Sequence, residues 1–313
     1  MTREIRKELN SAKKIYKAKK YQEAFEIYDK HYSENSEVFD HWDKVRYCWC
    51  IYYLFIKEQS DETVLMEYAE TVTEIVRQDD LNNSPVCVYT QCVFKVIMFL
   101  KAEDDWEYML YWLEKLNPKL LSENEKDSED SRFPSKKEDY YRYLSTAHFK
   151  CGDWQECIDA SKEALETLTS FAFNGDVWHK WRMAKSYNRL GKPEDALTYL
   201  YEVVDVQNDW YILKELADCS YQVGKTDDAM KYAGRSVLAD GSVNVKVNLY
   251  HLIYNILKGS DESMALKHAE LYLAIKLESG AQVAEEIEDL NIDETDLEIS
   301  ELEAEIRDYW AEL

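Results

Sequence analysis

AKSYNRLGKPEDALTYLYEVV (184–204) decides the fold, because three other segments repeat its pattern without gaps. They are AKKIYKAKKYQEAFEIYDKHY (12–32), STAHFKCGDWQECIDASKEAL (145–165) and ADCSYQVGKTDDAMKYAGRSV (217–237). Each has a small residue at its start, an aromatic residue one turn later, a turn, and a small residue early in a second helical pattern. Such a pattern predicts a helix-turn-helix unit, and its recurrence predicts a repeat array.

The turn and the second helix of each unit carry recognisable residues. Gly152, Gly191 and Gly224 can adopt the left-handed conformation that ends a first helix, whereas Lys19 occupies this place in the first unit. A small side chain in the second helix lets the two helices of a pair approach closely. The equivalent small residues are Ala24, Cys157, Ala196 and Ala229.

This order of small, aromatic, glycine and alanine residues resembles the tetratricopeptide repeat family, whose units are about 34 residues long. The resemblance is strong over 139–238 and covers a first unit at 8–34. Segment 245–277 is similar to a worn unit, and 38–121 contains helix-length amphipathic patterns that we interpret as degenerate units. The resemblance implies an all-α, right-handed superhelical solenoid of about seven antiparallel helix pairs, with a concave groove that binds peptides.

Composition agrees with a helical chain. Only 8 glycines and 4 prolines occur in 313 residues, so turns are few, and the hydrophobic fraction of 46% can form a substantial core. The formal net charge of −24 disfavours general binding to nucleic acids or to anionic membranes.

Location follows from what the sequence lacks. The first residues form no apolar signal region, and the longest nearly uncharged apolar run, 47–56, is too short to span a membrane. Seven cysteines without framework spacing favour reduced, buried thiols. We therefore expect a cytoplasmic protein.

Two segments interrupt the repeats. The charged segment 122–139 predicts a loop or hinge between N-terminal repeats at 1–121 and C-terminal repeats at 140–280. The tail, 281–313, has 13 acidic residues and one basic residue. From about residue 295 we expect a helix that caps the array or folds into its groove. Its expected apolar stripe is Leu290, Leu297, Leu302, Ile306 and Trp310.

No catalytic, metal or cofactor signature is present. The chain lacks the phosphate-loop, dinucleotide, zinc-protease and hydrolase motifs, and no two of its six histidines are four residues apart. Cys48 with Cys50, and Cys87 with Cys92, project in different directions from a helix. We expect no enzyme, no cofactor and no metal site.

The candidate binding residues lie on the first helices of the strong repeats. The expected core stripe of one such helix is Val177, Trp181, Ala184, Tyr187 and Leu190. An adjacent face carries residues at i, i+4, i+7 and i+11 that are basic or aromatic. The predicted groove residues on this helix and its two neighbours are Arg142, Thr146, Lys150, Trp178, Arg182, Lys185, Arg189, Tyr211, Lys214 and Tyr221.

These residues favour a non-enzymatic scaffold that binds a protein or peptide segment, acidic where it meets the basic residues. One alternative is a regulatory peptide sensor that changes conformation at 122–139. Another is single-stranded nucleic-acid binding by the basic and aromatic residues. A third interpretation makes the same residues an ordinary solvated helix face.

The two chain ends suggest a further contact. Residues 1–20 hold eight basic and two acidic side chains, opposite in sign to the tail. This asymmetry predicts head-to-tail self-association, or a tail that occupies the groove as an internal ligand.

Overall fold

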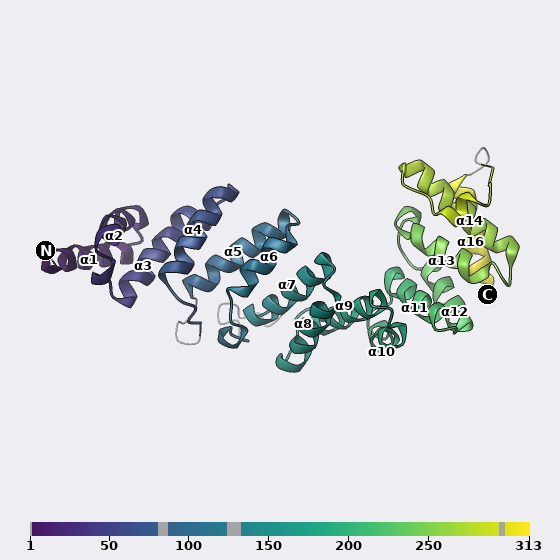
Figure 1. The fold of residues 1–313 in the computed structure, drawn as a ribbon, viewed down its shortest axis with the longest axis horizontal. Coiled ribbons are helices and arrows are strands. Elements are labelled where there is room, and N and C mark those ends of the chain that lie inside the picture. Colours follow the sequence, from purple (N-terminus) through teal and green to yellow (C-terminus); the bar gives the residue numbers. More distant parts are fainter. Residues whose placement is uncertain (1, 81–86, 124–132, 294–297) are drawn as a thin grey trace. The chain divides into compact units, whose positions relative to one another are not determined.

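The computed structural model describes residues 2–80, 87–123, 133–293 and 298–313 (Figure 1). Within these ranges the regular elements are all helical, and no strand occurs. The predicted all-α class is therefore confirmed, and consecutive helices pair as hairpins in a tetratricopeptide-like manner.

The chain divides into two compact units. Unit 1 comprises Met1–Asp153 and Glu166–Phe173, and unit 2 comprises Trp154–Leu165 and Asn174–Leu313. The division therefore does not fall at the predicted hinge, 122–139. The last four residues of that segment already belong to a helix, and 124–132 lie outside the described residues. The hinge and the coiling sense of the whole array stay predictions.

Unit 1 is a succession of helices in which each packs mainly on the next. The described residues of 38–121 contain helices, as the amphipathic patterns predict, and their assignment as degenerate repeats stays a prediction. The elements are α1 (Thr2–Lys17), α2 (Tyr21–Asn35), η1 (Ser36–Val38), α3 (His41–Ile51), the π-helix η2 (Tyr52–Ile56), α4 (Glu62–Ile75), α5 (Val88–Ala102), α6 (Trp106–Glu114), η3 (Pro118–Leu120) and α7 (Lys136–Cys151).

Two of the described turns that join paired helices in unit 1 take the left-handed conformation without glycine. Lys19, between α1 and α2, has φ 59°, and Asp104, between α5 and α6, has φ 58°. Asp105 then caps α6 by accepting a hydrogen bond from the Tyr108 amide at 3.0 Å. Asp104 thus occupies the place that glycine holds in the strong repeats, which is why the sequence pattern is faint there.

Unit 2 contains three clear helix pairs. Gly191 (φ 69°) and Gly224 (φ 76°) make the turns of the first two pairs, as predicted. The small positions Ala196 and Ala229 are fully buried, as are their counterparts in the other two motifs. The elements are α8 (Trp154–Thr167), α9 (Gly175–Arg189), α10 (Pro193–Val204), α11 (Trp210–Gln222), α12 (Thr226–Leu238), η4 (Val243–Lys246), α13 (Val247–Leu257), α14 (Glu262–Ser279), α15 (Glu285–Glu288) and α16 (Ile299–Glu312).

The acidic tail packs on the last two pairs. Helix α16 contacts α12 and α14, the second helices of successive pairs, so it is not a further layer stacked after α14. Leu302, Ile306 and Trp310 are buried as expected, whereas Leu290 is exposed and residue 297 lies outside the described ranges. Whether α16 acts as the cap of the array stays a prediction.

The cysteine side chains are reduced, as the sequence predicts. All seven cysteines are free thiols, and six of them are buried. None of the helices in the described ranges combines the length and the apolar character needed to cross a membrane.

Candidate functional site

The predicted groove residues of unit 2 lie on α9 and α11, which contact each other directly. On α9, Val177, Ala184 and Tyr187 of the expected core stripe are buried. Trp181 is only half-buried, and Leu190 is 38% exposed because it lies at the end of the helix, where the chain turns. We call the partly exposed residues of these helices the α9–α11 face. Its members are Trp178, Trp181, Lys185, Asn188, Arg189, Tyr211, Lys214, Glu215, Asp218, Tyr221 and Gln222.

One end of the α9–α11 face is aromatic. The rings of Trp178 and Trp181 meet edge to face at 6.0 Å, and Trp181 meets Tyr211 of α11 at 5.7 Å. Burial raises the pKa of Tyr211 to about 12, and its hydrogen bond to Asp209 at 3.1 Å adds to this shift. Tyr211 is therefore neutral at physiological pH and donates its proton to that carboxylate. Interlocked rings of this kind form a rigid apolar contact surface.

The lysines of the α9–α11 face share one carboxylate. Lys185 Nζ lies 3.6 Å and Lys214 Nζ 3.8 Å from Glu215 Oε1. Lys185 also stands 4.8 Å from the centre of the Trp181 ring. The positive surface expected from the sequence is thus partly neutralised, because Glu215 lies between the two ammonium groups.

Arg182 does not lie on the exposed face that the sequence predicts. The sequence places it on the exposed face, but its side chain is buried, with only 8% exposed, and its Nη2 atom lies 3.4 Å from Nδ1 of His179. The physical reason is that α9 contacts both α10 and α11, so its buried arc is wider than one amphipathic stripe. Arg182 therefore belongs to the interior of unit 2.

An amide network joins α9 to α11 at the other end of the face. Asn188 donates a hydrogen bond to Asp218 at 3.2 Å, and Gln222 donates to Asn188 at 2.9 Å and to Asp218 at 3.1 Å. Sequence reasoning missed Asn188 and Gln222. A usable signal was present, because Asn188 lies three residues after Lys185 on the same side of the helix.

The remaining two predicted residues of unit 2 differ in their availability. Arg189 is exposed and forms no ion pair within the described part of the chain. Tyr221 donates its hydroxyl proton to the carbonyl of Asn255 on α13 at 2.9 Å, so its polar group joins neighbouring pairs. Among the described residues, Arg189 is therefore the cation of the α9–α11 face without an ion pair.

The other predicted groove residues belong to α7 of unit 1. Arg142 pairs with Asp139 at 2.5 Å and lies over the Tyr143 ring at 4.6 Å, while Thr146 donates to the Arg142 carbonyl at 2.7 Å. Lys150 is exposed and lies 4.0 Å from Asp104. These side chains are mostly satisfied within unit 1.

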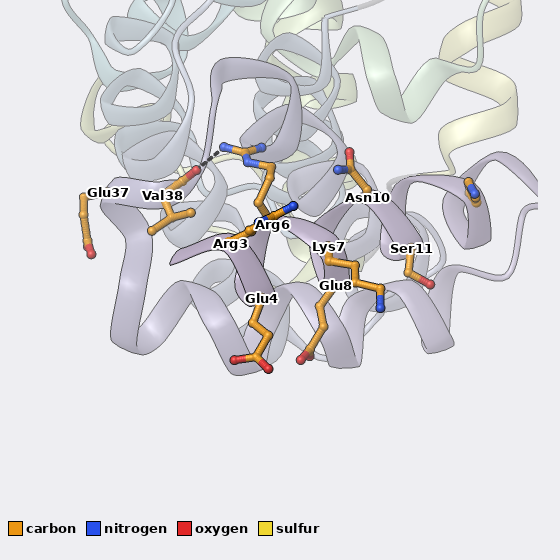
Figure 2. Close-up of a pocket in the computed structure, with 10 residues that line it drawn as sticks. Arg3, Glu4, Arg6, Lys7, Glu8, Asn10, Ser11, Glu37 and Val38 are labelled. Atoms are coloured by element: carbon orange, nitrogen blue, oxygen red, sulfur yellow. Dashed lines mark hydrogen bonds between the residues drawn. The ribbon is translucent and has the colours of Figure 1, made fainter. Parts of the chain in front are cut away.

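A hollow lies along α1 (Figure 2). The Arg6 guanidinium already has partners within unit 1. It pairs with the buried Asp43 at 2.5 Å and donates a hydrogen bond to the Val38 carbonyl (Figure 2). Acidic side chains alternate with the basic ones along the hollow. Its lining residues are Arg3, Glu4, Arg6, Lys7, Glu8, Asn10, Ser11, Lys14, Glu37 and Val38. The hollow is therefore a mixed-charge surface.

Within the described ranges, no group of three or more histidine, cysteine or acidic side chains has the arrangement to hold a metal ion. The buried thiols have little nucleophilic character, because burial raises the pKa of Cys92 and Cys219 and keeps both protonated.

Comparison with known proteins gives structural likenesses only. No family model matches the chain, and no curated protein matches it. The apo form of the quorum sensor NprR from B. thuringiensis has a TM-score of 0.49 at 15% identity, over 99% of this chain and 94% of that chain. The C-terminal part of a TPR repeat-containing protein from Cytophaga hutchinsonii has a TM-score of 0.45 at 15% identity, over 90% and 98% respectively.

A Rap protein complexed with competence and sporulation factor has a TM-score of 0.43 at 15% identity, over 99% of this chain and 90% of that chain. At such scores and identities, what these proteins bind carries no weight for this chain.

Proposed function

We propose that the protein is a non-enzymatic scaffold that binds a peptide, or a segment of another protein, along the α9–α11 face. The observation that carries the proposal is the amide network of Asn188, Asp218 and Gln222. A main chain offers one donor and one acceptor per residue, and side-chain amides offer both kinds of group. An extended segment can therefore replace the hydrogen bonds of this network with its own.

The aromatic end of the face would supply the apolar part of the binding energy. Trp178 and Tyr211 are partly exposed and held by Trp181 between them. Aromatic residues with few rotatable bonds commonly dominate binding energy at protein interfaces. A partner segment with an apolar side chain at this end fits the surface.

The charge of the face refines the kind of partner. Lys185 and Lys214 already share Glu215, so an acidic partner residue is best placed at Arg189. A nucleic acid would need several unpaired cations along one path. The pairing of both lysines therefore favours a polypeptide over a single-stranded nucleic acid. The peptide-sensor alternative, a cytoplasmic location and head-to-tail self-association stay predictions.

A paired-variant capture experiment tests the proposal. The full chain, a face variant (Trp178→Ala with Arg189→Glu) and a control variant (Thr198→Ala with Lys231→Glu) are used as baits in extract from the source cells. The control residues are exposed on α10 and α12, and Lys231→Glu makes the same charge reversal as Arg189→Glu. We expect a polypeptide that the control variant retains and the face variant loses at least tenfold. Equal recovery by both variants would place binding elsewhere.

A further inference from the structure

A cluster of three hydrogen-bond donors lies along α13 and the residue that ends it, and Tyr221 of the α9–α11 face contacts Asn255 of this cluster. His251, Asn255 and Lys258 are at i, i+4 and i+7, so they line one side of the helix. All three contact the side chain of Glu286 in α15 of the acidic tail. A carboxylate therefore already occupies the cluster.

The contacts satisfy both carboxylate oxygens. His251 Nε2 donates to Glu286 Oε1 at 2.5 Å, and Asn255 Nδ2 donates to the same oxygen at 3.1 Å. Lys258 Nζ lies 3.5 Å from Oε2. The pKa of Glu286 is held below its ordinary value of 4.5, mainly by the hydrogen bond from Asn255. The hydrogen bond and charge of His251 and the charge of Lys258 lower this pKa further. The cluster thus stabilises a carboxylate in its ionised form.

Groups other than Glu286 contact each of the three donors. The Asn255 carbonyl accepts the Tyr221 hydroxyl proton at 2.9 Å, and Lys258 donates to Asn255 Oδ1 at 2.6 Å. The His251 ring lies 5.0 Å from the ring of Tyr272 on α14. Removal of the Glu286 carboxylate therefore leaves the donors supported, as a preorganised site requires.

Exposure shows that the occupant can be exchanged. The side chain of Glu286 is 43% exposed and that of Lys258 is 45% exposed. The next residue, Ile287, is fully buried in the core with residues of α13 and α14. Because Ile287 anchors the backbone, the Glu286 side chain can rotate into solvent without release of α15.

We propose that His251, Asn255 and Lys258 form a binding site for a carboxylate of an acidic peptide, and that Glu286 is its intramolecular occupant. The proposal does not depend on the function of the α9–α11 face. An intramolecular ligand competes at an effective concentration on the order of millimolar. The intact chain therefore binds an external carboxylate weakly, and loss of the Glu286 charge strengthens that binding.

The test uses the full chain and a fluorescein-labelled hexaglutamate peptide with an amidated C-terminus. Fluorescence polarisation compares the wild type, Glu286→Gln and the control Glu288→Gln, which changes an exposed carboxylate in the same helix. Glu286→Gln removes the negative charge and leaves one acceptor oxygen in place of two, so the internal occupant is weakened. We expect Glu286→Gln to bind at least tenfold more tightly than the wild type and the control.

Further variants separate the site from the general effect of charge. Adding Asn255→Ala and Lys258→Met to Glu286→Gln should abolish the gain. Glu286→Asp keeps the charge on a shorter side chain, so it should increase the affinity for hexaglutamate less than Glu286→Gln does. It replaces Glu286→Gln in the comparison if that variant does not fold. A labelled alanine peptide with a free C-terminus tests whether a terminal carboxylate suffices.

Two results would overturn the proposal. One is equal affinity for hexaglutamate in Glu286→Gln and Glu288→Gln. The other is a gain that survives the loss of Asn255 and Lys258, because the peptide would then respond only to the lower negative charge of the tail.

Discussion

Protonation of His268 should weaken the attachment of α16 to the rest of unit 2. His268 is fully buried on α14, donates Nδ1–H to the Met264 carbonyl at 2.6 Å and accepts the Trp310 indole N–H at its Nε2 atom, at 3.0 Å. Protonation would put a second N–H on the ring and remove this acceptor. Burial lowers the pKa of His268 to about 4, although the Met264 hydrogen bond and Asp261 act in the opposite direction.

The sign and size of the effect follow from proton linkage. The pKa is lower in the folded state than in the unfolded chain, whose ordinary value is 6.5. The unfolded state therefore binds more protons between these values, and stability falls as the pH drops through this interval. Between pH 7 and pH 5 the expected loss is about 2 kcal/mol from this one residue.

Hydrogen exchange of α16 measures this loss locally, since protection reports the free energy of opening. The wild type is compared at pH 7 and pH 5, after correction for intrinsic exchange rates, with His268→Gln and with His41→Gln, which changes an exposed histidine. We expect the pH-dependent loss in the wild type and His41→Gln but not in His268→Gln. The reasoning fails if His268→Gln keeps the same pH dependence as the wild type.

Three further predictions concern turns and packing. Gly191→Ala should destabilise unit 2 by about 1 kcal/mol in urea unfolding, because φ is 69° there. Lys19→Gly should stabilise unit 1 by up to about 1 kcal/mol, because a lysine there has φ 59°. The opposite signs would contradict the assignment of left-handed turns. Gly234→Ala should destabilise by about 1–3 kcal/mol despite the higher helix propensity of alanine, since its Cβ would overlap the Trp310 ring, and a gain in melting temperature would refute this packing. Tyr221→Phe should cost about 1 kcal/mol through the lost hydrogen bond to α13, and an unchanged urea midpoint would argue against that bond.

The helix pairs could be predicted because their determinants are local. A glycine at 191 followed by a proline at 193 and a small residue at 196 specifies a turn and a close second helix within six positions. The faint repeats were harder to predict from the sequence. Asp104 makes the same left-handed turn despite its steric cost, so no glycine marks the turn there.

The candidate site was only partly predictable, because its properties depend on distances between helices. A single-helix projection cannot show that Arg182 is covered by neighbouring helices, or that Glu215 of α11 lies between two lysines. The amide network of Asn188 and Gln222 joins residues 34 positions apart and needs the same tertiary information. The position of α16 across α12 and α14 is likewise set by packing, with Gly234 making room for Trp310.

Site-specific photo-crosslinking tests the proposed binding face most directly. A benzophenone amino acid is placed at Arg189, beside the amide network, or at Thr198, which is exposed on α10, and each protein is irradiated in extract from the source cells. The proposal predicts a polypeptide that crosslinks at position 189 and not at 198, and that unlabelled wild-type chain displaces. Equal crosslinking at both positions, or none at 189, would contradict a binding site on the α9–α11 face.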